Sequence, residues 1–127
     1  MLAVIASLAL GSVWAAGSPT KLVYFDPEDF SLSQAQKTEL ETLLPILETA
    51  TAVEVRGYVQ RSREADKNKG PANLSYKRAE AVANYLQSLL KEKSKNKRTI
   101  DWVVIGAGQP ALDMGLPDAR RVEIDVR

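Results

Sequence analysis

Arg78 is the residue with the clearest chemical potential in this chain, because the sequence places it in the first turn of a long amphipathic helix. Ser75 stands just before it, and serine is a favoured N-cap residue. The unpaired backbone N–H groups of a helix N-terminus attract anions, and a guanidinium beside them strengthens that attraction. The sequence therefore predicts an anion-binding site where this helix begins.

The composition argues against most classes of enzyme. The 127 residues include no cysteine and no histidine. Thiol nucleophiles, histidine-based triads and the usual zinc ligand sets are therefore excluded. Asp26, Glu28 and Asp29 form a carboxylate cluster, but within a turn that contains Pro27 we expect solvated side chains and not a glycosidase pair. We expect a non-catalytic protein with no metal and no cofactor.

The net charge of +1 gives no long-range field that would favour nucleic acid as a partner. The first sixteen residues, 1–16, are apolar and end in small residues, with Val13 and Ala15 at the positions that signal peptidase reads. We predict a signal peptide at 1–16 and a flexible leader at 17–21, although no lysine or arginine precedes the apolar run. A retained hydrophobic anchor is the alternative, but the run is shorter than the roughly 20 residues that a spanning helix needs.

Two elements must position Arg78. Residues 53–59 alternate between apolar and polar side chains, which is the period of a half-buried strand. Residues 75–90 carry apolar side chains at helical spacing, from Ala79 to Leu90. The intervening residues 60–72 are rich in charge, Asn, Gly and Pro, which is typical of a loop.

The remaining elements complete a simple order. We predict a strand at 22–25, a helix at 33–47 and two further strands at 100–105 and 121–127. Ser33 and Gln36 have the spacing of a capping box, and Pro45 predicts either a kink or an early helix end followed by a short turn over 46–49.

The strand at 100–105 is apolar almost throughout, with Trp102 expected in the core, which indicates a central strand covered wholly or partly on both faces. The order βαβαββ predicts an α/β (α+β) two-layer sandwich, with the helices on one face of a mixed four-stranded sheet, spanning 22–127.

Four motifs in this order resemble those of the OmpA-like peptidoglycan-binding domain family. They are GYVQ at 57–60, LSYKRAEAVANYL at 74–86, GAGQP at 106–110 and RRVEI at 120–124. The resemblance runs from about Leu22 to Arg127. It implies the same two-layer fold and a location in the periplasm, associated with the cell wall or the outer membrane.

The resemblance also implies a ligand, the diaminopimelate residue of a peptidoglycan stem peptide. In the family, an aspartate takes its ammonium group, the arginine of L-S-x-x-R-A takes its carboxylate, and an asparagine holds the peptide backbone. Arg78 matches the arginine. Gln60 stands in place of the aspartate, and Pro71 in place of the asparagine, with Asn68 and Asn73 close by.

A lost charge-assisted hydrogen bond weakens binding by about tenfold to a hundredfold. Gln60 can still accept a neutral hydrogen bond, and Glu64 or Asp66 in the same loop can replace the charge. In the terminal motif, Ala119 replaces an asparagine. The ligand-binding residues that we predict are Arg78, Gln60, Tyr58, Asn73, Ser75 and Arg120.

Some of these assignments have a structural alternative. Tyr58 and Tyr76 either line the pocket or pack at an edge of the domain. Arg78 either binds ligand or is held by a carboxylate such as Asp101 or Asp118.

Two hypotheses of function follow. The first is a periplasmic module that binds peptidoglycan non-covalently through a degenerate diaminopimelate site. The second is a protein-interaction component of an envelope assembly, such as a secretion or conjugation complex, that keeps the fold and has lost the ligand.

Overall fold

The computed structural model describes residues 19–60, 73–94, 99–110 and 117–127. The predicted signal peptide at 1–16 lies outside these residues, as do Glu64, Asp66, Asn68 and Pro71. The elements in chain order are β2 (Lys21–Tyr24), α2 (Gln34–Glu41), α3 (Leu44–Leu47), β3 (Ala52–Gly57), α4 (Leu74–Lys93), β4 (Asp101–Gly106), a 3-10 turn η2 (Pro117–Ala119) and β5 (Arg121–Val126).

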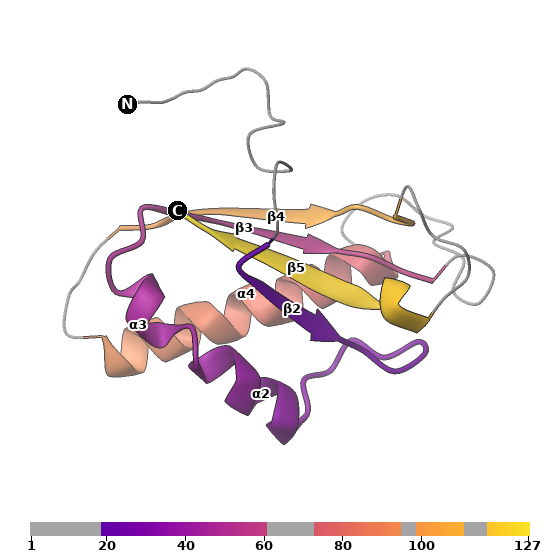
Figure 1. Cartoon of the computed structure of the whole chain (residues 1–127), viewed down its shortest axis with the longest axis horizontal. Helices are drawn as coiled ribbons and strands as arrows, with labels where there is room; N and C mark the ends of the chain where they lie inside the picture. The colour runs from indigo at the N-terminus through magenta and orange to yellow at the C-terminus, as the bar shows by residue number, and fades with distance from the viewer. Residues whose placement is uncertain (1–18, 61–72, 95–98, 111–116) are drawn as a thin grey trace, which may run out of the picture.

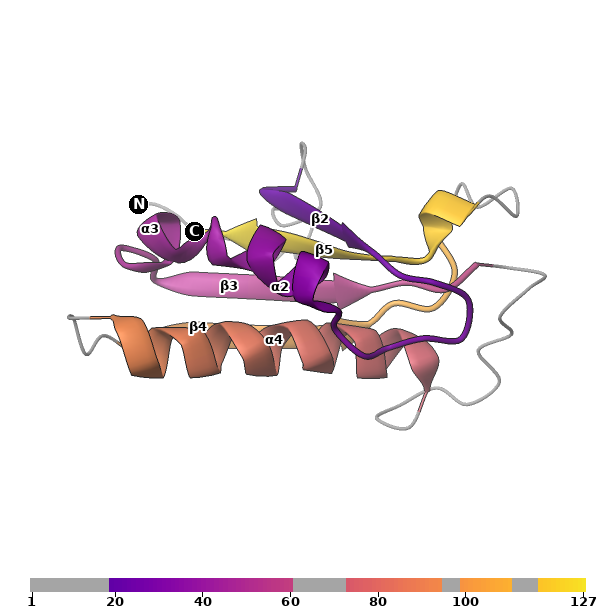
Figure 2. The same cartoon turned by 90° about the horizontal axis from the view of Figure 1, so that it is seen from below.

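The strands form a four-stranded sheet in the order β2-β5-β3-β4 (Figure 1). β5 runs antiparallel to both β2 and β3, whereas β3 and β4 are parallel, so the sheet is mixed. The helices lie on one side of the sheet, with the long α4 beneath β3 and β4 (Figures 1 and 2). The predicted two-layer α/β fold is confirmed.

The first helical region ends early, as one of the two alternatives predicted. Ser33 and Gln36 form the capping box that begins α2. α2 then stops at Glu41, and the short helix α3 begins at Leu44 with Pro45 in its first turn. A proline is tolerated there because the first backbone N–H groups of a helix have no partner within the helix. The first strand begins one residue before its predicted start at 22. β2 begins at Lys21, and the Thr20 backbone N–H already donates to Ile124 O (2.8 Å).

The core lies between the sheet and the helices. Val53 and Val55 of β3 and Val122 and Ile124 of β5 are completely buried against this layer. The helices contribute Leu40, Leu47, Val82 and Leu86, which are equally buried. Within the described part of the chain, no helix is long and apolar enough to span a membrane.

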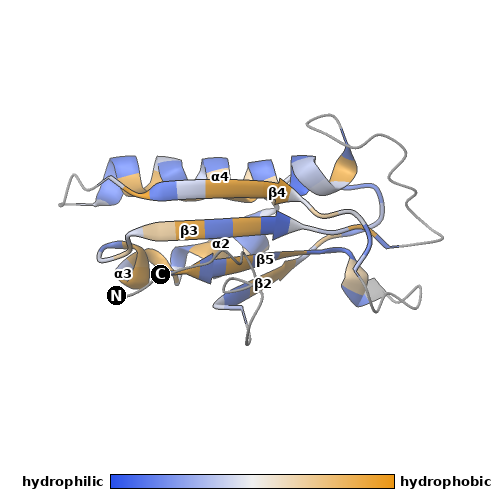
Figure 3. Cartoon of the chain, turned by 90° about the horizontal axis from the view of Figure 1, so that it is seen from above, coloured by the Kyte–Doolittle hydropathy of each residue, from blue (hydrophilic) through white to orange (hydrophobic). Residues whose placement is uncertain are grey.

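β4 corrects one prediction, because it is an edge strand and not a central one. Its helix-side residues Trp102 and Val104 pack against the core, while Val103 on the other face is 40% exposed. Figure 3 shows β4 coloured hydrophobic along most of its length, whereas β3 and β5 alternate. A run of apolar residues therefore indicated that side chains are partly covered, but it did not indicate how many strands pair with this one.

Two glycines allow the start of α4 to lie against the sheet. Gly57 and Gly106 are partners in the parallel register of β3 and β4. A Cβ atom at Gly57 would lie 1.9 Å from Ser75 O and 3.1 Å from Ala79 N. One at Gly106 would lie 2.8 Å from both the Cβ and the backbone N of Tyr76. The sheet and the first turn of α4 can approach this closely only without side chains at both positions.

We predict that Gly57→Ala destabilises the domain by about 3 kcal/mol or more, because its methyl group meets rigid backbone and not a side chain that can move. Chemical denaturation followed by circular dichroism measures the change. Asn84→Ala, at an exposed position of α4, is the control and should change the free energy of unfolding by less than about 0.5 kcal/mol. Equal stability of Gly57→Ala and wild type would mean that α4 does not approach β3 this closely.

Candidate ligand-binding site

The N-terminus of α4 is capped by Asn73, and not by Ser75 as the sequence predicted. The Asn73 side-chain oxygen accepts hydrogen bonds from Tyr76 N (2.7 Å) and from the Ser75 hydroxyl (2.8 Å). Asn73 is 6% exposed and Ser75 is completely buried. These two predicted ligand residues therefore build the helix start itself.

Arg78 is completely buried beneath the turn that follows β2. Its Nε donates to Asp29 O (2.7 Å), one terminal nitrogen donates to Asp26 O (3.0 Å) and the other donates to Tyr58 O (3.0 Å). The guanidinium also lies over the Phe25 ring, 5.3 Å from its centre. Backbone carbonyls, and not the carboxylate of Asp101 or Asp118, receive these three hydrogen bonds. The structure thus gives Arg78 a role in holding the β2–α2 turn against the end of β3.

Gln60 and Arg120 form a second pair close to this turn. Gln60 is 6% exposed, and its side-chain oxygen accepts a hydrogen bond from the Arg120 guanidinium. Arg120 Nε donates to Phe25 O (2.9 Å). Gln60 therefore meets a protein cation from the residue that directly precedes β5.

Tyr58 lies on the opposite face of the sheet from the helices. The Arg121 guanidinium stacks over its ring at 4.7 Å, and its hydroxyl lies 3.5 Å from a Glu123 carboxylate oxygen. Burial, and then the Glu123 charge, raise the pKa of the Tyr58 hydroxyl. Only the backbone carbonyl of Tyr58 reaches Arg78, so its side chain takes the edge-packing alternative.

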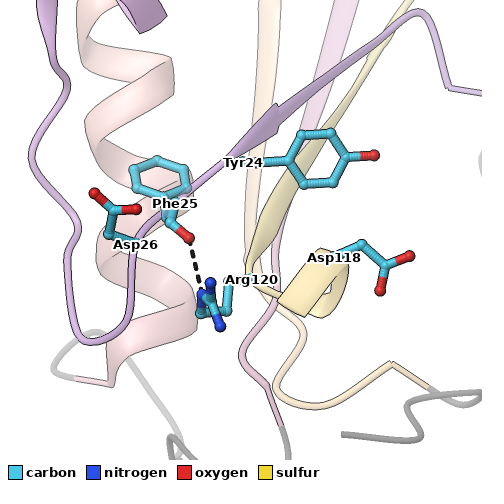
Figure 4. Close-up of a pocket in the computed structure, with 5 residues that line it drawn as sticks. All are labelled: Tyr24, Phe25, Asp26, Asp118 and Arg120. Atoms are coloured by element: carbon cyan, nitrogen blue, oxygen red, sulfur yellow. Dashed lines mark hydrogen bonds between the residues drawn. The ribbon is translucent and has the colours of Figure 1, made fainter. Parts of the chain in front are cut away.

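A ligand-sized hollow lies beside these residues. Its volume is about 410 Å³, and it is lined by Tyr24, Phe25, Asp26, Asp118 and Arg120 (Figure 4). Tyr24 ends β2, and Phe25 and Asp26 follow it, whereas Asp118 belongs to η2 and Arg120 directly precedes β5. Of the six residues that the sequence predicted, only Arg120 lines this pocket.

The pocket offers both signs of charge. The carboxylates of Asp26 and Asp118 lie on either side of Arg120 (Figure 4). Among the residues that the structure describes, neither carboxylate accepts a hydrogen bond, and Arg120 forms no ion pair. One cation and two anions at the rim of one hollow can hold a zwitterionic amino-acid head group, since its carboxylate and ammonium groups need partners of opposite charge.

Asp26 and Asp118 were not among the predicted ligand residues. Both stand in turns, where a carboxylate is usually solvated. Their positions in the sequence could have indicated them, because Asp118 lies two residues before Arg120 and Asp26 lies two residues after β2, the strand that pairs with β5. The described residues also contain no group of three or more carboxylates placed to hold a metal ion.

The fold and this pocket define a two-layer α/β domain with a surface site suited to a small charged ligand. A family model described as the OmpA family matches residues 24–123, and the chain belongs to this family. A search of curated proteins found no match.

Solved structures agree on the fold. The OmpA-like domain of FopA1 from Francisella tularensis subsp. tularensis SCHU S4 is 20% identical, with a TM-score of 0.56 over 84% of this chain and 72% of that one. The peptidoglycan-associated lipoprotein from Burkholderia pseudomallei is 18% identical, with a TM-score of 0.50 over 85% of this chain and 91% of that one. At these identities the likeness concerns the fold alone.

We predict that Arg78→Met lowers the free energy of unfolding by about 3–5 kcal/mol, because it removes a fully buried cation and leaves three partly buried carbonyls without their donors. Thermal and urea denaturation measure this change. Lys77→Met, one residue earlier on the same turn, removes a charge that lies over the Phe30 ring at 5.2 Å and should cost less than about 1 kcal/mol. If Arg78→Met retained full stability and lost only ligand binding, the structural role of Arg78 would be wrong.

Proposed function

We propose that this chain is a non-catalytic cell-envelope module that binds the diaminopimelate residue of peptidoglycan non-covalently in the pocket around Arg120. Arg120 takes the side-chain carboxylate of diaminopimelate, and Asp26 or Asp118 takes the neighbouring ammonium group. The site is degenerate because Gln60 replaces the aspartate that takes the ammonium group in the family. Asp26 and Asp118 supply the missing negative charge from the pocket.

The observation that carries this proposal is the pocket of about 410 Å³ in which Arg120 lies between two carboxylates. Arg78 supports it indirectly. Its guanidinium is bonded to Asp26 O and Asp29 O, so it fixes the turn that carries one of the two aspartates. Membership of the OmpA family, and a solved neighbour named a peptidoglycan-associated lipoprotein, make peptidoglycan the ligand to test first. The location that fits this role is the periplasm, at the cell wall or the outer membrane.

A second function, protein interaction within an envelope assembly, is favoured by a different observation. Arg78 and Gln60, which occupy the family's two charge positions, both bind groups of the chain itself. A domain that had lost the ligand would keep such contacts for stability alone. The two proposed functions differ in whether a stem peptide binds, so one titration separates them.

We predict saturable amide shifts at Phe25–Asp26 and Asp118–Arg120 when the purified chain is titrated with a stem peptide that contains diaminopimelate. A stem peptide with lysine in that position is the matched ligand control, since lysine has the ammonium group but no second carboxylate. The double variant Asp26→Asn, Asp118→Asn should weaken binding about tenfold to a hundredfold. Asp101→Asn, an exposed aspartate outside the pocket, should leave binding unchanged. Absence of shifts would sink the proposal and favour protein interaction.

We predict that Gln60→Asp weakens binding of the same peptide. A carboxylate at position 60 would pair with the Arg120 guanidinium, to which Gln60 now gives a neutral acceptor, and would compete with the ligand carboxylate. Isothermal titration calorimetry measures the change in affinity. Tighter binding by Gln60→Asp would instead place the ligand at Arg78 in the family's own manner.

A further inference from the structure

The two edges of the sheet differ in how they are covered. At the β2 edge, α2 approaches closely, and the Gln36 amide donates to Tyr24 O (2.6 Å) while Lys21 pairs with Glu39 (2.7 Å). β4 forms the other edge. α4 packs on one face of β3 and β4 and does not pair with the backbone of β4 (Figure 2).

The register identifies which backbone groups of β4 face outward. Asp101 N donates to Thr51 O (3.0 Å) and Ala107 N donates to Gly57 O (2.9 Å). Because alternate residues of a parallel strand bond to the same neighbour, Val103 and Ile105 also point toward β3. The N–H and C=O groups of Trp102, Val104 and Gly106 therefore point away from the sheet, and no described residue bonds to them.

This edge lacks the features that protect exposed strands. Natural edge strands commonly carry lysine or proline or are very short. β4 has six residues, DWVVIG, with neither lysine nor proline. Its Val103 is 40% exposed on the face opposite the helices. The sequence has the composition of a central strand, and the described part of the domain supplies only one neighbour.

We propose that β4 pairs antiparallel with β4 of a second copy of this chain, with Val104 on the two-fold axis. In this register the two Val104 residues exchange backbone hydrogen bonds, and Trp102 does the same with the partner copy's residue at position 106. These are the outward-facing residues of the edge, so the pairing satisfies all three. The sheet continues across the axis, and α4 of each copy stays on the same face.

The side chains in this register are self-complementary. Val103 comes opposite Ile105 of the other copy, so the exposed apolar groups on the open face cover one another. Trp102 comes opposite Gly106, so no second bulky side chain of β4 stands across from the indole ring on the face that α4 covers. Asp101 comes opposite Ala107, and no two like charges of β4 meet. This matching of the strand with itself favours a second copy over an unrelated extended peptide.

Sedimentation equilibrium of the purified chain tests the proposal, together with amide hydrogen exchange at several protein concentrations. We expect a monomer–dimer equilibrium, and protection of the Trp102, Val104 and Gly106 amides that rises with concentration. A chain that stays monomeric up to about millimolar concentration, near the weak limit of specific affinity, would overturn the proposal. Protection that is independent of concentration would also overturn it.

Val104→Pro is the decisive variant. It removes an outward N–H that β3 does not use, and proline is tolerated at such edge positions. We expect dimerisation at least about tenfold weaker, with the far-UV circular dichroism of the wild type. If Val104→Pro unfolds, Val103→Lys tests the same edge by placing a charge on it without altering the backbone. Ile46→Lys, at a 46% exposed position of α3, is the control and should leave the dimer intact. A dimer that survives both edge variants would exclude the β4 pairing.

Discussion

The buried guanidinium of Arg78 forms the interactions on which the end of the domain that carries the pocket depends. It joins three segments that are far apart in the sequence, because its donors meet carbonyls of Asp26, Asp29 and Tyr58 while its backbone belongs to α4. Hydrogen bonds from a charged donor contribute about 1.5–3 kcal/mol each, and an unsatisfied buried carbonyl costs a similar amount. The turn after β2, the end of β3 and the first turn of α4 are therefore held as one unit.

That unit also positions the pocket in which we propose that a ligand binds. With Arg78 bonded to the turn and Gln60 bonded to Arg120, the charged side chains that line the pocket beside Phe25 are Asp26, Asp118 and Arg120. The turn itself contains Glu28 with a φ of 62°, an uncommon conformation for a residue with a side chain. The Arg78 hydrogen bonds on both sides of Glu28 help to hold it there. The same contacts thus stabilise the turn and orient one wall of the pocket.

The fold followed from the sequence because each element carried its own period. Alternation at Val53, Val55 and Val59 gave β3, helical spacing gave α4, and Ser33 with Gln36 gave the start of α2. The same alternation also contained a signal that the site prediction did not use. If Val59 faces the helices, then Tyr58 must face the other way, and its side chain cannot line a pocket beside Arg78.

The site itself was less predictable, for a physical reason. Sequence motifs placed Arg78, Gln60 and Arg120 at one end of the sheet. They could not indicate that backbone carbonyls would accept the hydrogen bonds of the Arg78 guanidinium. A carbonyl is present at every residue, so composition does not reveal it. The turn after β2 and η2 likewise line one pocket because β2 pairs antiparallel with β5, between segments about a hundred residues apart in this chain.

β4 shows the same limit from the opposite direction. Apolar periodicity measures how the two faces of a strand are covered, whereas the number of neighbouring strands depends on backbone hydrogen bonds that every sequence can form. The parallel crossover through α4 places β4 beside β3 and ends the sheet there, so a strand with central composition stands at an edge. Such a strand is stable in the monomer because α4 covers its inner face. Its outer edge, to which no described residue bonds, and its exposed Val103 are then the part of the described domain where the least structure would have to change to admit another strand.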